Sequence, residues 1–299
     1  MNRLLCILIC MTFSFELWAG EPALYTSRGT RYDVDDVEGV MSELLSDYNT
    51  EYITVFVHGR GKHPEKGLTI IPDIEERYGV KTIMFTWPSW ESAVERPVHS
   101  GINSADEMLI FLTKLNEYIR NNPHKAARFK LTLLVHSMGN IVFKKMMDDL
   151  YQGDFKWDLF SNVILNSADV PSKKHSEWVE KIDFGKSLYI TNNDDDSVLF
   201  GSELLDSFNG DYDDYEGPRL GKDLAKDFKK KGVVKSQNAI YLDLSKLSYG
   251  GHRHYLMKDK SKYNFQKNIF TSLLHGEKPR LDRSAGVYKV RGNVYHFKR

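Results

Sequence analysis

Short apolar runs alternate with longer amphipathic stretches along most of the 299-residue chain. Six of the runs are rich in β-branched and aromatic residues and almost continuously apolar, which predicts strands buried on both faces. These runs are Tyr52–His58, Lys81–Thr86, Lys130–Val135, Asn162–Asn166, Ser187–Thr191 and Ala239–Leu244. Apolar residues at helical spacing predict helices over Val37–Leu45, Ile102–Ile119, Asn140–Leu150 and Tyr263–Leu274. Strands and helices that alternate in this way predict a doubly wound α/β fold with a mostly parallel sheet.

Two segments fall outside this alternation. Residues 206–235 are first acidic and rich in turn formers and then rich in lysine, which predicts a charged insertion on the surface of the sheet. Residues 284–299 alternate around Arg291-Gly292-Asn293 and predict a small C-terminal β-hairpin. Because the charged segment is interpreted as an insertion and not as a second domain, residues 21–299 are expected to form one domain.

The first 20 residues have the layout of a secretory signal peptide. Arg3 precedes an apolar run from Leu4 to Phe15, and small residues occupy positions 19 and 20. The run is shorter than the roughly 20 residues of a membrane span, and Glu16 ends it, so no stable membrane anchor is expected after processing. The sequence predicts an exported protein, periplasmic or secreted. An uncleaved apolar helix or a first strand is the alternative.

The charge balance and the positions of the cysteines limit the binding partners and catalytic groups that the chain can use. Lys plus Arg and Asp plus Glu both number 41, which leaves no global charge to attract nucleic acid. Both cysteines, Cys6 and Cys10, lie in the signal segment, so a processed chain would hold no thiol. Catalytic chemistry would then rest on serine, histidine and carboxylate side chains.

A candidate nucleophile follows the strand Lys130–Val135. The residues VHSMG, from Val135 to Gly139, match the GxSxG elbow except at its first glycine. In that motif a tight strand-to-helix turn exposes the serine hydroxyl above the sheet. Ser137 is therefore either a nucleophile or the N-cap of the next helix.

A second turn supplies candidate oxyanion donors. The strand Tyr52–His58 runs into Gly59-Arg60-Gly61, a glycine-rich turn where α/β-hydrolases place one of the two donors. The backbone N–H groups of Arg60 and Met138 are the expected pair.

A serine nucleophile needs a histidine base and a carboxylate that fixes the tautomer of its ring. Gly250-Gly251-His252 follows the last predicted strand, and Asp194-Asp195-Asp196 follows the strand Ser187–Thr191. The order Ser, Asp, His is that of α/β-hydrolases. His254 is an alternative base. Asp169, after the strand Asn162–Asn166, is an alternative acid.

Two groups of residues resemble metal-binding patterns, but each lacks part of the pattern. His252 and His254 have an HxH spacing without a clear carboxylate partner. The acidic residues Asp211, Asp213, Asp214 and Glu216 lack the spacing of the twelve-residue calcium loop. No metal ion or other cofactor is expected.

A series of motifs runs in order from Val57 to Tyr255: VHGRG, FTWPSW, SADEMLIFLTKL, LLVHSMGN, NSADV, NNDDDSVL, GPRLG, NAIYLDLS and GGHRHYL. The series resembles a bacterial family of α/β-hydrolases labelled domain of unknown function 900. The resemblance implies a serine hydrolase with Ser137 as nucleophile and His252 as base. An Asp followed three residues later by Leu implies Asp196 as the acid, whereas counting from the end of the strand favours Asp194.

The sequence thus predicts a serine esterase of the α/β-hydrolase type, with the catalytic residues Ser137, His252 and Asp196. Its expected substrate is a small-molecule ester or an acyl lipid, cleaved through an acyl-enzyme. An acyltransferase would use the same residues. A binding protein that keeps the fold without turnover is the alternative from another class, because fold does not determine function, and a peptidase ranks lower.

Export is tested by N-terminal sequencing of the protein from its native host. The mature chain is expected to begin near Gly20 or Glu21. An intact Met1 in the cytosolic fraction would contradict both the export prediction and the expected absence of cysteine from the working protein.

Overall fold

The computed structural model describes residues 20–297 apart from residues 62–66, 151–157, 207–211, 223, 225–227, 229–232, 248–250 and 257–263. The expected signal peptide up to residue 19, Asp211 of the calcium pattern and Gly250 of the histidine loop therefore lie outside the described residues. No helix in the described part is long and apolar enough to cross a membrane.

The described strands form one sheet in the order β2-β1-β4-β3-β5-β6-β7-β8-β10-β9. Their bounds are β1 Ala23–Tyr25, β2 Arg31–Tyr32, β3 Tyr52–Val57, β4 Lys81–Thr86, β5 Lys130–His136, β6 Phe160–Asn166, β7 Gly185–Asn192, β8 Ala239–Asp243, β9 Val287–Arg291 and β10 Val294–Phe297. The strands from β4 through β10 in this order pair in parallel. Antiparallel pairs occur only toward the edges of the described sheet, at β2-β1, β1-β4 and β10-β9. The predicted mostly parallel α/β fold is confirmed.

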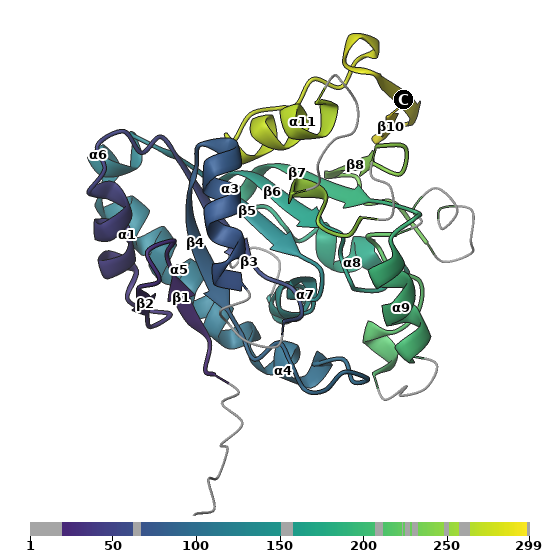
Figure 1. The fold of residues 1–299 in the computed structure, drawn as a ribbon, viewed down its shortest axis with the longest axis horizontal. Coiled ribbons are helices and arrows are strands. Elements are labelled where there is room, and N and C mark those ends of the chain that lie inside the picture. Colours follow the sequence, from purple (N-terminus) through teal and green to yellow (C-terminus); the bar gives the residue numbers. More distant parts are fainter. Residues whose placement is uncertain are drawn as a thin grey trace, which may run out of the picture.

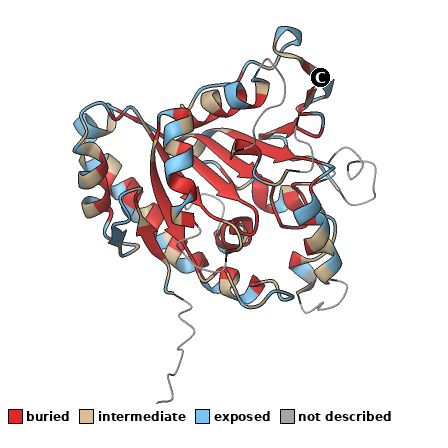
Figure 2. Cartoon of the chain, in the orientation of Figure 1, coloured by how far each residue is buried: buried red, intermediate tan, exposed pale blue. Residues whose placement is uncertain are grey.

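Helices cover both faces of this sheet (Figure 1). Their bounds are α1 Val37–Leu45, α3 Ile70–Tyr78, α4 Val98–Asn103, α5 Ala105–Asn121, α6 Pro123–Ala126, α7 Gly139–Asp149, α8 His175–Val179, α9 Ser197–Asp206 and α11 Phe265–Leu274, with the 3-10 turns η1 Asp213–Tyr215, η2 His254–Leu256 and η3 Arg283–Ala285. Neighbouring strand residues point to opposite faces. Val55 and Val57 pack with α1, α5 and α7, whereas Phe56 packs with α3 and α11. Both faces of the central strands are therefore buried (Figure 2).

The structure refines the predicted elements. Each of the six predicted strands is present, with ends shifted by two residues or fewer. The predicted helix Ile102–Ile119 is interrupted at Ser104, which separates α4 from α5. The Ser104 hydroxyl donates to the carbonyl of Ser100 at 2.8 Å, a local hydrogen bond of the kind that competes with regular helix. Helices α3, α6, α8 and α9 were not predicted.

The C-terminal hairpin is confirmed, and it extends the main sheet because β10 pairs in parallel with β8. Gly292 allows the tight turn, with a φ of 62°.

The segment predicted as a surface insertion differs from that expectation in its middle. Arg219 and Leu220 are fully buried. The amides of Leu220 and Gly221 donate to the carbonyls of Val170 and Ala168 at 2.8 and 3.0 Å, which fixes this segment against the loop after β6. Part of the charged segment is thus core, because the charge of Arg219 is neutralised there by buried aspartates.

Two glycines test this packing. A Cβ at Gly221 would lie 2.2 Å from the backbone nitrogen of Ala168, so Gly221→Ala should lower the free energy of unfolding, by about 1–3 kcal/mol or more. Gly201, inside α9, has nothing within 4 Å of its added Cβ, so Gly201→Ala should instead raise stability, by up to about 1 kcal/mol. Urea unfolding of both variants checks the pair. Equal stabilities would contradict the packing at residue 221.

Candidate active site

Ser137 lies in the turn between β5 and α7, with a backbone φ of 55°. This left-handed conformation is strained for a residue other than glycine and occurs at functional turns. A Cβ on Gly139 would lie 2.7 Å from the carbonyl oxygen of His58, so the second motif glycine is required for close approach. Val135 instead lies within β5 with its side chain in the core, and the turn forms without the first glycine.

The Ser137 backbone is tied to the neighbouring strand β6. Its N–H donates to the carbonyl of Asn166 at 3.0 Å, and its carbonyl accepts from the N–H of Asp169 at 3.2 Å. The N-cap of α7 is Met138. The Ser137 hydroxyl is therefore not used to cap this helix and is directed to a histidine.

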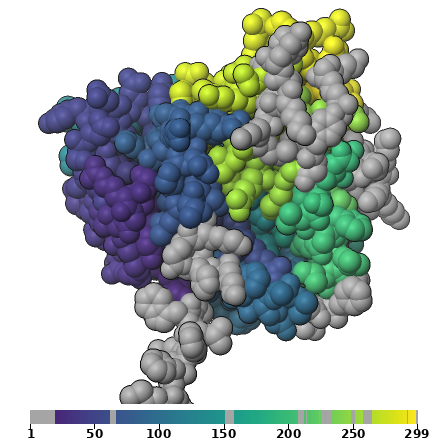
Figure 3. Space-filling model, viewed as in Figure 1, coloured from purple at the N-terminus to yellow at the C-terminus, as the bar shows by residue number. Residues whose placement is uncertain are grey.

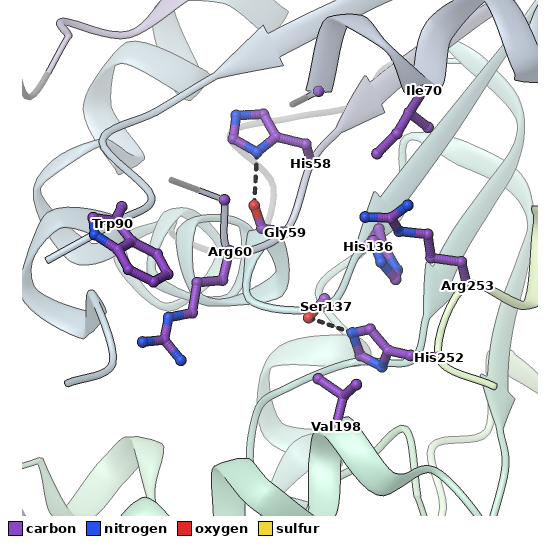
Figure 4. Close-up of a pocket in the computed structure, with 12 residues that line it drawn as sticks. His58, Gly59, Arg60, Ile70, Trp90, His136, Ser137, Val198, His252 and Arg253 are labelled. Carbon is purple, nitrogen blue, oxygen red and sulfur yellow. Dashed lines mark hydrogen bonds between the residues drawn. The ribbon is translucent and has the colours of Figure 1, made fainter. Parts of the chain in front are cut away.

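His252 contacts both Ser137 and Asp196. Its Nε2 lies 2.8 Å from Ser137 Oγ (Figure 4). Its Nδ1 lies 2.8 Å from Asp196 Oδ2. With the ring proton on Nδ1, His252 donates to the carboxylate, and Nε2 can accept from the serine hydroxyl. The carbonyl of His252 accepts from Ser167 Oγ at 2.6 Å, which anchors the loop over the sheet edge.

Asp196 has two structural tasks. Its Oδ1 accepts from the amides of Val198 and Leu199 at 3.0 Å each, so it caps the first turn of α9. Its Oδ2 bonds the histidine, and the side chain is buried. Asp194 and Asp195 are exposed, so the structure brings the third aspartate of the cluster, and not the first, to His252.

The side chains of Asp169 and His254, the alternative acid and base, bond to other partners than Ser137 and His252. Asp169 is paired with Arg96 at 3.2 Å and with Arg219 at 2.7 Å, and it accepts from Ser202. Burial alone would raise the pKa of Asp169, but the two arginines lower it below its ordinary value. His254 is fully buried beside Thr191, with its Nδ1 3.2 Å from Thr191 Oγ1. The two histidines of the HxH pattern thus have different partners.

Four buried charges form a closed ring below the site, which we call the arginine–aspartate ring: Arg96, Asp169, Arg219 and Asp206. Arg96 pairs with Asp206 at 2.7 Å, and Arg219 pairs with the same aspartate. Each arginine contacts both aspartates, so the formal charge of the ring is zero. The ring joins the loop before α4, the loop after β6 and the end of α9. Of these four residues only Asp169 was a candidate from the sequence, because nothing in the spacing indicated its partners.

Buried histidines surround the serine. Burial lowers the pKa of His58 and of His254 to about 4. Burial, together with the nearby His252, holds the pKa of His136 well below its usual range. The rings of His136 and His252 lie 4.8 Å apart, and Asn166 bonds the Nδ1 of His136 at 3.0 Å. These three buried histidines are therefore neutral at pH 7.

Two cavities meet at Ser137. One, of about 380 Å³, is lined by residues that include His58, Trp90 and Arg253. The other, of about 320 Å³, lies against α9 and includes Arg96 and Asp169. Ser137, Arg60 and Val198 border both. In the space-filling view the lime-coloured segment that carries His252 lies between α3 and α9 (Figure 3).

The loop after β3 contacts the elbow directly. A Cβ on Gly59 would lie 2.6 Å from the Cβ of Ser137. In the described part of the chain, neither the amide of Arg60 nor that of Met138 donates to a protein acceptor. Both expected oxyanion donors therefore have a free N–H near the serine.

The acidic calcium pattern is only partly described. Glu216 accepts a hydrogen bond from the amide of Tyr212 at 2.8 Å, while Asp211 and the side chain of Asp213 lie outside the described residues. No group of three or more potential metal ligands occurs among the described residues.

A family model described as "Alpha/beta hydrolase of unknown function (DUF900)" matches residues 33–251. The chain belongs to this family. The resemblance inferred from the ordered motifs is thereby confirmed, and the protein is an α/β-hydrolase. No curated protein matches this α/β-hydrolase significantly.

Solved structures with some similarity are esterases. Esterase PE8 is 14% identical, over 54% of this chain and 79% of that one, with a TM-score of 0.32. The Pyrobaculum calidifontis esterase is 11% identical, over 69% and 70%, with a TM-score of 0.32. The Pyrococcus furiosus esterase Pf2001 is 10% identical, over 69% and 86%, with a TM-score of 0.30. Similarity at this level carries no functional argument.

The buried histidines predict a pH dependence of stability. His58 and His254 have folded-state pKa values of about 4, below the ordinary 6.5, so only the unfolded chain binds their protons between these values. Their contribution is complete above pH 6.5 and is lost as the pH falls toward 4. The loss should reach roughly 3 kcal/mol per histidine.

Urea unfolding across this pH range measures the effect. His254→Asn should flatten the decline of the free energy of unfolding, whereas His124→Gln, at an exposed position of α6, should leave the slope unchanged. An identical slope in the parent and in His254→Asn would show that His254 is not neutral when folded.

Proposed function

We propose that this protein is a serine hydrolase that cleaves carboxylic esters or related acyl substrates through Ser137, His252 and Asp196. The observation that carries the proposal is the His252 ring, which lies 2.8 Å from the serine hydroxyl on one side and 2.8 Å from a buried carboxylate on the other. A merely structural histidine would not need a strained serine as its second partner. The strain at Ser137 supports a functional role for this turn.

The geometry supports a two-step acyl transfer. His252 Nε2 accepts the hydroxyl proton as Ser137 Oγ attacks the substrate carbonyl, and Asp196 stabilises the imidazolium that forms. The tetrahedral intermediate then collapses, and the proton on His252 passes to the leaving alcohol. This leaves an acyl group on Ser137. A water molecule, deprotonated by the same nitrogen, hydrolyses the acyl-enzyme and restores the serine.

The negative charge that develops on the carbonyl oxygen needs donors. The amides of Arg60 and Met138 are assigned this role because both flank the elbow and neither is used by another group in the described part of the chain. Ser137 lies where two cavities meet, so one cavity can hold the acyl part and the other the leaving group. The arrangement suits a small-molecule ester or an acyl lipid, and we propose that it acts after export.

The nucleophile is tested by labelling the purified protein with a fluorophosphonate probe and by measuring turnover of short and long acyl esters. Ser137→Ala should abolish labelling and reduce turnover by up to ~10⁶-fold, because no other group would accept the acyl chain. Labelling that persists in Ser137→Ala would assign the nucleophile to another serine. Unchanged turnover in Ser137→Ala would contradict Ser137 as the nucleophile, whereas absence of both labelling and turnover in the wild type would favour a binding protein.

A matched aspartate pair tests the acid within the same experiment. Asp196→Asn should lower kcat by about 10⁴-fold, because an amide cannot hold the required tautomer of His252. Asp194→Asn, two residues away and exposed, should retain activity. Equal activity of the two variants would contradict the assignment of Asp196.

A further inference from the structure

Arg60 borders both cavities beside Ser137. Its guanidinium lies over the ring of Trp90, 4.8 Å from the centroid, and Nη2 donates to the carbonyls of Glu95, at 2.9 Å, and Ser92. These contacts hold the charged group in place. Arg60 and Arg253 lie on opposite sides of Ser137 in the close-up view (Figure 4).

The guanidinium of Arg60 keeps unused donors. Of its five N–H groups, Nη2 carries two, and both bonds described above go to backbone carbonyls. Nε is buried without a hydrogen-bond partner, and Nη1 donates to no protein acceptor in the described part of the chain. Because the buried Nε is closed to a ligand, the two N–H groups of Nη1 remain on this fixed cation to bind one.

No carboxylate forms an ion pair with Arg60 among the described residues. Asp169, which also borders the second cavity, is already bonded to Arg96 and Arg219 in the arginine–aspartate ring. Glu91 is the other acidic neighbour that influences Arg60, and it is exposed. The ring is neutral as a unit, so among the described residues no carboxylate is left to pair with Arg60 alone.

The side chains that line the larger cavity are also positively charged on balance. Its described lining contains Arg60 and Arg253 but no acidic side chain. His58 and His136 line it as neutral rings, so they add no positive charge at pH 7. A partly buried cation with free donors attracts an anion more strongly than one in open water, because the local dielectric is lower.

We propose that the acyl substrates of this protein carry an anionic group, a carboxylate or a phosphate, that binds the side chain of Arg60 while the ester carbonyl lies at Ser137. Both oxyanions accept charge-assisted hydrogen bonds from guanidinium N–H groups, here those of Nη1. Arg60 is thereby a specificity residue through its side chain, in addition to the role proposed for its backbone amide. This inference rests on the proposed hydrolase function.

Paired esters that differ only in charge test the inference and distinguish the two anions. The carboxylate pair is 4-nitrophenyl hydrogen adipate and its methyl ester. The phosphate pair is a 1-acylglycerol 3-phosphate and the 1-acylglycerol with the same acyl chain. Their hydrolysis is measured as the release of fatty acid. For each pair the measured quantity is the ratio of kcat/KM for the anionic ester to kcat/KM for the neutral ester.

The wild type should favour the anionic member of at least one pair, which identifies the anion. Arg60→Gln should reduce that ratio by roughly 10- to 100-fold, the range expected for one charge-assisted hydrogen-bonded contact. Arg60→Lys, which keeps the charge but loses the fixed Nη1 donors, should give an intermediate ratio. Arg120→Gln, an exposed residue of α5, removes the same charge elsewhere and should leave the ratio unchanged.

A ratio that is the same in the wild type and Arg60→Gln, or a wild-type preference for both neutral esters, would overturn the inference. If neutral esters are still cleaved in a Ser137-dependent manner, the hydrolase proposal survives that result. If no ester is cleaved and no probe labels Ser137, the proposed function fails, and the substrate inference fails with it. Thermal unfolding of each Arg60 variant shows whether a changed ratio reflects lost folding, and the intermediate ratio of Arg60→Lys separates charge from structure.

Discussion

The backbone of Ser137 is held in a left-handed turn by its neighbours, and the geometry of the whole site depends on that constraint. The strain is sustained by two hydrogen bonds, one to the end of β6 and one to the loop after it, and by the close approach of Gly59 to Ser137 and of Gly139 to the backbone of His58. Only a parallel sheet brings the carboxyl ends of β3, β5 and β6 together at one edge. The elbow is thus a product of sheet topology as much as of its own five residues.

Asp196 connects the chemistry of the site to the architecture of α9. One carboxylate oxygen caps this helix and the other bonds His252, so the proposed base is positioned by the same group that starts the helix. The far end of α9 carries Asp206, a member of the arginine–aspartate ring. Both ends of the helix are therefore fixed by buried charge. Removing one member of such a ring leaves an uncompensated ion, which costs far more than the pair itself contributes.

Electrostatics divide the site into a neutral part and a positive part. His58, His136 and His254 are neutral because they are buried. The arginines of the ring are balanced by aspartates, whereas Arg60 forms no ion pair with a described carboxylate. Ser137 therefore lies among neutral rings, with a fixed cation on one flank. In the proposed mechanism His252 accepts the serine proton, and in the proposed substrate recognition Arg60 binds the anionic group.

The sequence alone determined the order of the strands along the chain and the turns that carry the candidate site residues, in VHSMG, HGRG and GGH. Apolar periodicity and glycine-rich turns are local signals. It left Asp194, Asp169 and His254 as rivals, since spacing along the chain does not show which side chains meet. Tertiary structure brings Asp196 to His252 because the first two aspartates leave the strand toward solvent. It also buries Arg219, which composition assigned to a surface loop, because two aspartates more than 10 residues away in sequence lie beside it in the fold. Charge pairing across the sheet edge is a property of three dimensions, and only the folded chain decides it.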